Sequence, residues 1–284
     1  MAQVDVPDVP EMAGAPAPLL QVRGLTAEFT SRGQQVPAVN GIDFEVRAGE
    51  SVGFVGESGS GKSVTARCVM RLEPEGSSIS VGGSVRFDGR ELLTLSEPAM
   101  RDVRGKRIAM VFQDPMTSLN PVLTVGAQVD DMLRRHTSLS RAAARRRTVE
   151  LLDLVGIHEP GRRADDYPHQ FSGGMRQRVL IAIAVSCEPD LLIADEPTTA
   201  LDVTVQAQIL RLLVRLREEL GMALMLITHD FGVIAGMVDR VYVMYHGDIV
   251  ESGPVQDILT SPRDAYTRSL IDAVPRLTAT GRGR

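Results

Sequence analysis

The chain has 284 residues, of which 43% are hydrophobic, and this is enough to bury the core of one large domain or two modest ones. A net charge of -5 excludes a protein that is held on nucleic acid or an anionic membrane by its overall charge. The two cysteines lie far apart and no signal-peptide pattern opens the sequence, which argues against a disulfide framework and predicts that the protein resides in the reducing cytoplasm. No apolar run reaches the roughly 20 residues that span a bilayer.

The N-terminal region predicts strands after an unstructured start. Residues 1–18 contain proline, alanine and acidic residues without periodicity and indicate a disordered lead-in. From Leu19 to Val55 the pattern is strand-like, with a turn at residues 47–50, and a second strand pair is predicted around Gly83–Asp88. This region is therefore expected to be rich in β-structure.

The segment of residues 115–171 has a different pattern. It is arginine-rich, has a helical period and is broken by prolines at 121, 160 and 168, so it indicates a helical insertion. After it we expect a helix from about Gly174, strands at 191–195 and 223–228, a helix at 203–220 capped by Asp202 and ended by Gly221, and a hairpin at 241–253. Strands that alternate with helices predict a mainly parallel sheet that is covered on both faces.

Residues 56–63, GESGSGKS, match the phosphate-loop pattern G-x-x-x-x-G-K-[ST], after an apolar strand and before a helix-compatible run. The glycines let backbone N–H groups turn inward, and the following helix directs its positive end at the anion. Lys62 is one of only two lysines among 31 basic residues, and its compact ammonium fits such a loop better than the planar fork of arginine. The nucleotide-binding residues expected here are Gly56, Glu57, Ser58, Gly59, Ser60, Gly61, Lys62, Ser63 and Val64, with Lys62 at the β- and γ-phosphates and Ser63 on Mg²⁺.

Two further motifs suit the same chemistry. The apolar strand LLIAD ends in Asp195 and Glu196, and carboxylates at the carboxyl end of a parallel strand face the ligand crevice. Asp195 is predicted to hold Mg²⁺ through a water, and Glu196 is the candidate base for the attacking water. The run FSGGMRQR places Ser172, Gly173, Gly174 and Gln177 at the start of another helix, a second anion site that we expect to serve the nucleotide of another subunit.

Together these motifs resemble the ATP-binding-cassette (ABC) ATPases. The resemblance covers residues 19 to about 260 and includes GESGSGKS, FQDP around Gln113, FSGGMRQR, LLIADEP, TALD at 199–202 and ITHD ending at 230. The run PMTSLNPVLTVG at 115–126 is similar to the cassettes of oligopeptide, dipeptide and nickel importers. The resemblance implies an α/β P-loop NTPase (RecA-like) fold with a mainly parallel sheet core at 19–114 and 172–255, an antiparallel β-subdomain, a helical subdomain at 115–171 and a short C-terminal extension at 261–284.

The same resemblance implies roles for individual residues. Gln113 would sense Mg²⁺ and the attacking water, and His229 would contact the γ-phosphate and orient Glu196 as part of the catalytic set. Asp202 would cross the interface between two cassettes while it caps its own helix, and Phe29 would stack on adenine. Two cassettes would then face each other head to tail with ATP between them.

The implied activity is hydrolysis of ATP, with Mg²⁺ as cofactor, to power an importer of peptides or of a related solute such as nickel. The implied partners are a second ABC ATPase subunit, two membrane permease subunits that dock on the helical segment, and an extracytoplasmic solute-binding protein; no nucleic acid is expected. The implied place is the cytoplasmic face of the membrane. A soluble cassette ATPase of a non-transport enzyme complex stays open as the alternative.

Some related readings are disfavoured by the residues themselves. Neither Asn40 nor Asn120 opens the N-K-x-D motif of a GTPase, and the insertion is far too short for the coiled coil of a chromosome or repair ATPase. A translation factor of this class would carry two cassettes, and we find one. Some peptide-importer cassettes hold an iron–sulfur cluster in a C-terminal extension, but no cysteine follows Cys187 here, so no cluster is expected.

Overall fold

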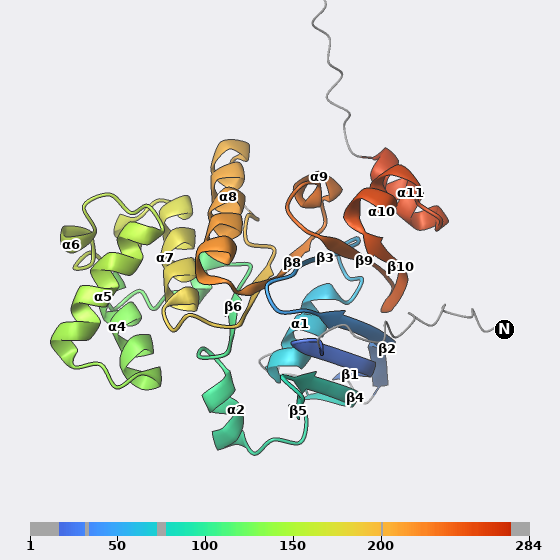
Figure 1. Cartoon of the computed structure of the whole chain (residues 1–284), viewed down its shortest axis with the longest axis horizontal. Coiled ribbons are helices and arrows are strands. Elements are labelled where there is room, and N and C mark those ends of the chain that lie inside the picture. The colour runs from blue at the N-terminus through green and yellow to red at the C-terminus, as the bar shows by residue number, and fades with distance from the viewer. Residues whose placement is uncertain (1–16, 32–33, 73–77, 200, 274–284) are drawn as a thin grey trace, which may run out of the picture.

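The computed structural model of the chain describes residues 17–31, 34–72, 78–199 and 201–273. Within these residues the chain forms a six-stranded and a four-stranded sheet with helices around them (Figure 1). The expected lead-in lies outside the described residues except for its last two positions, and so do residues 274–284 of the expected C-terminal extension.

The six-stranded sheet is mainly parallel, as the sequence predicts. Its strand order is β10-β9-β3-β8-β7-β6, and only β10 runs antiparallel to its neighbour. The strands are β3 (Ser51–Val55), β6 (Ile108–Val111), β7 (Leu191–Asp195), β8 (Ala223–Thr228), β9 (Arg240–Tyr245) and β10 (Asp248–Pro254). The β9–β10 hairpin is confirmed, and its turn has positive φ at both His246 and Gly247, which suits the right-handed twist of the strands. The sequence did not predict the short edge strand β6.

The four-stranded sheet is antiparallel and holds the N-terminal strands. Its order is β2-β1-β4-β5, with β1 (Leu20–Ser31), β2 (Gln34–Val46), β4 (Ser78–Phe87) and β5 (Arg90–Glu91). The strand-like N-terminal pattern is therefore confirmed, and these strands form a sheet apart from the parallel one.

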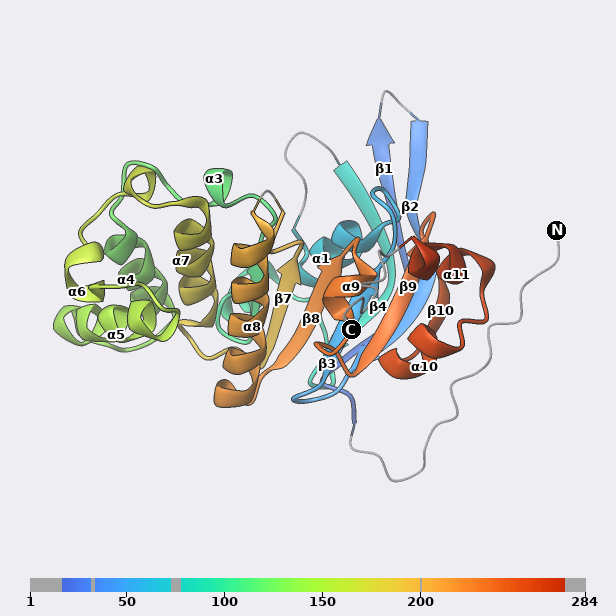
Figure 2. The same ribbon diagram turned by 90° about the horizontal axis from the view of Figure 1, so that it is seen from above.

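The helices complete the fold. They are α1 (Lys62–Met70), α2 (Glu97–Val103), α3 (Pro115–Ser118), α4 (Val125–His136), α5 (Arg141–Leu154), α6 (Pro160–Arg163), the 3₁₀-helix η1 (Pro168–Gln170), α7 (Gly173–Val185), α8 (Val203–Leu220), α9 (Phe231–Ile234), α10 (Val255–Thr260) and α11 (Ala265–Asp272). Figure 2 shows α4 to α7 at one end of the molecule and α10 and α11 at the other. None of the helices in the described part of the chain is both long and apolar enough to cross a bilayer.

Alternating side chains of the parallel strands pack on the two faces of the six-stranded sheet. In β8, Leu224 and Leu226 belong to one buried cluster, whereas Ala223, Met225 and Ile227 belong to the other. The first cluster includes apolar residues of α7 and α8, and the second includes those of α1 and the antiparallel sheet. The predicted cover on both faces is therefore present, with α7 and α8 on one side and α1 and the antiparallel sheet on the other.

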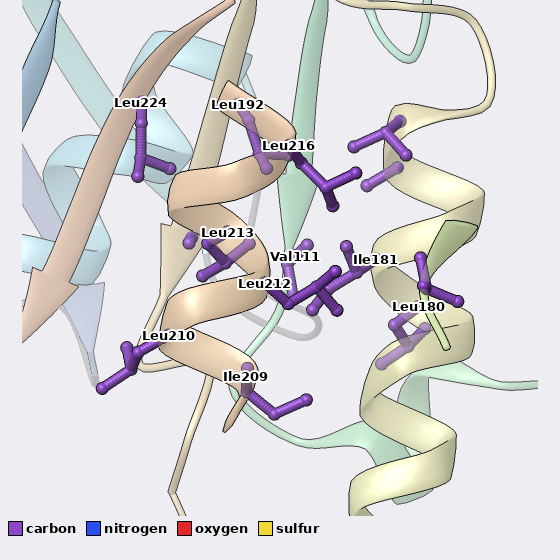
Figure 3. Close-up of a cluster of buried hydrophobic side chains, with 14 of the residues drawn as sticks. Val111, Leu180, Ile181, Leu192, Ile209, Leu210, Leu212, Leu213, Leu216 and Leu224 are labelled. Carbon is purple, nitrogen blue, oxygen red and sulfur yellow. The ribbon is translucent and has the colours of Figure 1, made fainter. Parts of the chain in front are cut away.

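Helices α7 and α8 pack against each other over the strands. Figure 3 shows Ile181 of α7 and Leu212 of α8 in this cluster, beside Val111 of β6. The apolar face of α8 is turned to this cluster, since Ile209, Leu213 and Leu216 are fully buried. Besides α8 and β6, α7 also packs against α4 and α5, so it joins the helical segment to the sheet.

Candidate nucleotide site

The phosphate loop lies between β3 and α1, as its sequence predicts. Gly61 has φ +102°, and a Cβ there would lie 2.5 Å from the carbonyl oxygen of Ala38, so only glycine fits. The side chain of Lys62 is buried and folds back over the loop, where its Nζ donates to the carbonyls of Gly56 at 2.7 Å and Glu57 at 2.8 Å. The loop therefore has a fixed shape with its lysine inside.

Several amides of the loop point to no acceptor. Among the residues that the structure describes, the backbone N–H groups of Gly59, Gly61, Lys62 and Ser63 donate to no other group. The residues around them differ in burial: Glu57, Ser58 and Gly59 are exposed, Ser60 is buried, and Ser63 and Val64 are half-buried. Unpaired amides at the start of α1 form a cradle of donors that suits a phosphate.

Ser63 and Asp195 meet at the carboxyl end of β7. The Ser63 hydroxyl donates to Asp195 Oδ1 at 2.6 Å, and the Asp195 side chain is almost fully buried. Burial raises the pKa of Asp195, the hydroxyl of Ser63 lowers it, and the charge of Glu196 raises it further, so the net pKa lies above its ordinary value. This pair of oxygens, predicted separately, offers ligands of the kind that Mg²⁺ prefers.

Glu196 is held by three side chains. Gln113 Nε2 and Thr199 Oγ1 both donate to Glu196 Oε2, at 2.8 and 3.0 Å, and His229 Nδ1 lies 3.4 Å from Oε1. The structure thus brings Gln113, Glu196 and His229 together, as the predicted catalytic set requires. Sequence reasoning gave no role to Thr199, although it opens the TALD run; Ala200 of that run lies outside the described residues.

The backbone of Glu196 is also unusual. It has φ +45°, a left-handed conformation that costs a non-glycine residue roughly 1–2 kcal/mol. Its N–H donates to the carbonyl of Ile227 in β8 at 3.0 Å, and its carbonyl accepts from the amide of Thr199 at 3.2 Å. Strain of this kind persists only where the surroundings impose it, and it directs the carboxylate toward Gln113 and His229.

The charges of the site oppose one another. Burial lowers the pKa of the Lys62 ammonium, while the carboxylates of Glu196, Asp195 and Glu57 raise it, and burial is the larger effect. One buried cation therefore lies among several carboxylates next to a row of unpaired amides.

A second cluster surrounds the Ser-Gly-Gly turn. Ser172 caps α7, since its hydroxyl accepts from the amide of Met175 at 3.4 Å, and Asp202 caps α8 by accepting from the amide of Val205 at 3.0 Å. A Cβ on Gly174 would lie 2.5 Å from Val205 Cγ1, so α7 and α8 begin in close contact. Ser172, Gly173, Gly174 and Asp202 therefore lie together, and both Ser172 and Asp202 are exposed.

Two predicted residues do not share in these contacts. Gln177 is 1% exposed on α7, and its Nε2 has no hydrogen-bond partner in the part of the chain that the structure describes. Phe29 lies half-buried on β1, where it pairs with Val36 of β2 and Ile79 of β4. Gln177 is thus covered by its own chain, while part of the Phe29 ring is accessible.

Known sequences resemble this chain over most of its length. The sequence family described as "ABC transporter" matches residues 39–199. The probable peptide ABC transporter ATP-binding protein y4tR of Sinorhizobium fredii is 55% identical over 257 residues, which cover 90% of this chain and 77% of that protein. The oligopeptide transport ATP-binding protein OppD and the dipeptide transport ATP-binding protein DppD of Bacillus subtilis are each 51% identical over 263 residues, 93% of this chain and 74% and 78% of those proteins.

The fold of the chain is also similar to those of solved ATP-binding cassettes. The dimeric post-hydrolysis structure of the ATP-binding cassette MJ0796 with ADP and Pi has a TM-score of 0.74 at 29% identity, covering 83% of this chain and 98% of that one. The structure of cbiO1 from Clostridium perfringens, part of the ABC transporter complex cbiONQ, has a TM-score of 0.72 at 27% identity, covering 86% of this chain and 91% of that one.

Proposed function

Because the chain belongs to the ABC transporter family of ATP-binding subunits, we propose that it hydrolyses ATP to power the uptake of peptides through separate membrane permease subunits. The observation that carries this proposal is the position of Glu196 beside the phosphate loop, where Gln113 donates a hydrogen bond to it and His229 lies 3.4 Å away. The relatives named for peptide, oligopeptide and dipeptide transport favour peptides over a related solute such as nickel.

The residues present fit a triphosphate. The unpaired amides of Gly59, Gly61, Lys62 and Ser63 are donors for its phosphate oxygens, and Lys62 supplies the positive charge once it exchanges its carbonyl partners for the β- and γ-phosphates. The accessible part of Phe29 is proposed to stack on adenine, which is a contact that any base would accept.

The oxygens of Ser63 and Asp195, with the amide oxygen of Gln113, are the proposed ligands of Mg²⁺. When bound, this ion neutralises charge that develops on the transferred phosphate. Asp195 suits the role because it is buried without a salt-bridge partner among the described residues, so that a cation would favour its ionised form.

Glu196 is the proposed base for the attacking water. Hydrogen bonds from Gln113 and Thr199 occupy one of its oxygens, Oε2, so Oε1 is the oxygen that takes the proton. His229 lies near Oε1 and has an exposed side chain, so it both orients the carboxylate and can reach the γ-phosphate. A base in this position raises the rate by about 10²–10⁴-fold.

The second cluster is proposed to act on a neighbouring cassette. Ser172, Gly173 and Gly174 would contact a nucleotide held by the phosphate loop of that cassette, with Asp202 at the shared interface. Gln177 would take part only if the start of α7 opened, since its side chain is buried. The further partners proposed are two permease subunits on the helical segment and, through them, an extracytoplasmic solute-binding protein, which places the chain on the cytoplasmic face of the membrane.

Reconstitution tests this function. The chain would be purified with its native partners, placed in proteoliposomes, and assayed for uptake of labelled dipeptides and oligopeptides with ATP, using the Glu196→Gln variant as the inactive control. We expect uptake that depends on ATP and disappears in the variant. Recovery of soluble enzyme subunits instead of permeases would favour the alternative, a cassette ATPase of a non-transport complex.

A further inference from the structure

We infer that Tyr266, on the C-terminal helix α11, is a positioning residue that fixes the phosphate loop and thereby sets the affinity for ATP. The inference rests on the proposed ATP-binding role of that loop. Its starting point is a contact between segments far apart in sequence: the backbone N–H of Glu57, the second residue of the loop, donates to the Tyr266 hydroxyl at 2.9 Å.

With this hydrogen bond, both polar groups of the Gly56–Glu57 peptide are bonded to side chains. The carbonyl of Gly56 and the N–H of Glu57 belong to the same peptide group. Lys62 Nζ donates to that carbonyl at 2.7 Å, and Tyr266 accepts from that N–H. When Lys62 turns to a phosphate, it gives up the carbonyl, and the Tyr266 hydroxyl is then what keeps this peptide plane in its orientation. The loop amides that follow depend on that orientation, because the peptide planes of a tight loop are linked.

Tyr266 is itself held firmly. Asp264 caps α11 and accepts from the amides of Tyr266 at 2.8 Å and Thr267 at 3.2 Å. Glu251 of β10 accepts from the amides of Arg263 and Asp264, so the start of the extension is fixed to the sheet. The position of the Tyr266 hydroxyl is therefore fixed, because α11 is bonded to β10 through Glu251.

The ring of Tyr266 adds a second contact with the sheet. It packs on the ring of Tyr245 at the end of β9, with ring centroids 4.2 Å apart. Burial raises the pKa of the Tyr266 hydroxyl, and the bond from Glu57 opposes this only in part, so the group stays a neutral acceptor at ordinary pH. The contact is thus a neutral hydrogen bond supported by aromatic packing.

Tyr266→Phe tests the inference, because it removes the hydroxyl and keeps the ring. We expect the KM for MgATP and the Kd for ATP to rise about 3- to 10-fold, the effect of one lost neutral hydrogen bond, with kcat within about 2-fold of the parent. Amide hydrogen exchange at Glu57 should become faster, while exchange in β3 stays unchanged. A purely structural role for α11 would instead lower kcat or thermal stability without selectively affecting Glu57.

Tyr245→Phe is the matched control. It removes a hydroxyl from the neighbouring ring, which makes no hydrogen bond within the described ranges, and should leave the KM for ATP unchanged. Equal ATP affinities for Tyr266→Phe and the parent would overturn the inference. If the parent chain bound no ATP at all, the proposed function would fail first and the inference with it, so the two failures are distinguishable.

Discussion

The two clusters of motif residues use their polar groups in different ways. In the phosphate cluster, comprising the loop of residues 56–63 with Gln113, Asp195, Glu196 and His229, polar side chains bond to one another across the chain. In the turn cluster, formed by Ser172–Gly174 and Asp202, the polar side chains bond only to the starts of their own helices among the described contacts. The side chains of the phosphate cluster therefore contact one another, whereas Ser172 and Asp202 of the turn cluster are exposed and, within the described residues, bond only within their own helices.

This difference indicates what each cluster lacks. The phosphate cluster has unpaired amides and the buried ammonium of Lys62, which suit an anion, but nothing from the turn cluster bonds to it in the part of the chain that is described. The turn cluster is built firmly, because α7 and α8 pack over a shared buried core (Figure 3). A well-built, exposed pair of helix starts suits contact with another molecule, and the proposed one is a second cassette.

The largest expected effect is on ATP turnover, when Glu196, the proposed general base in the phosphate cluster, is replaced. Glu196→Gln keeps the size of the side chain and removes the proton acceptor, so ATP turnover should fall by about 10²–10⁴-fold while ATP binding is retained. Single-turnover hydrolysis and nucleotide titration measure the two quantities separately. Glu218→Gln, an exposed position on α8, is the matched control and should keep the parent rate. Hydrolysis by the Glu196 variant at the parent rate would mean that another group is the base.

The next effect concerns the affinity of the same cluster. Lys62→Ala removes the buried cation of the loop, and ATP should bind about 10- to 100-fold more weakly, as expected for a lost charge-assisted hydrogen bond. Isothermal titration with ATP measures this. The only other lysine, Lys106, is exposed, so Lys106→Ala makes the same chemical change away from the loop and should leave the affinity unchanged.

A smaller effect distinguishes the two roles of Ser172 in the turn cluster, which are capping α7 and contacting the nucleotide of a neighbouring cassette. Ser172→Asp keeps a good N-cap for α7 but places a negative charge where a neighbour's triphosphate is proposed to lie. Thermal stability should stay near that of the parent, while ATP-induced dimerisation, measured by light scattering, should weaken about 5- to 10-fold. Ser140→Asp makes the same change at the cap of α5, where the hydroxyl accepts from Ala143, and should affect neither property. Unchanged dimerisation of the Ser172 variant would leave the turn cluster with capping alone.

Much of this comparison could be predicted from the sequence. The phosphate loop, the apolar strand before Asp195 and the caps of α8 are local patterns, in which residue type and spacing determine the geometry. The two capping residues Asp202 and Gly221 are both confirmed, the second with φ +65°. Motif chemistry of this kind depends on neighbours in sequence, which the sequence displays directly.

Contacts between distant segments could not be predicted in the same way. The strand β6 has only four residues, too few to show a clear period, yet it leads to Gln113, which contacts Glu196 83 positions away. The contact of Tyr266 with the loop spans 209 positions and depends on how α11 packs after β10. The burial of Gln177 likewise follows from the packing of α7 on its neighbours, because its position in the FSGGMRQR run looks the same whether the side chain faces inward or outward.

The smallest expected effect concerns Asp239, whose hydrogen bonds join β3, the strand before the phosphate loop, to α8, the helix that Asp202 caps. Asp239 Oδ2 accepts from the amide and hydroxyl of Ser51, where β3 begins, and from Arg217 of α8. Burial raises the pKa of Asp239, but the hydrogen bonds from Ser51 and the charge of Arg217 outweigh it, and the net pKa lies below its ordinary value. Since the folded-state pKa is depressed, the stabilisation is complete above the unfolded pKa of about 3.9 and is lost as pH falls through the folded value.

Asp239→Asn should therefore lower the free energy of unfolding at neutral pH by no more than about 1 kcal/mol, since the side chain is 59% exposed and solvent screens its charge. The difference between variant and parent should shrink in urea titrations as the pH falls below about 4, because the parent carboxylate then loses its charge as well. The exposed Asp153 of α5 provides the control, Asp153→Asn, which should show no such convergence. If the difference in unfolding free energy stayed constant down to low pH, the charge of Asp239 would not contribute to stability. The contact between α8 and β3 would then depend on packing and not on this charge.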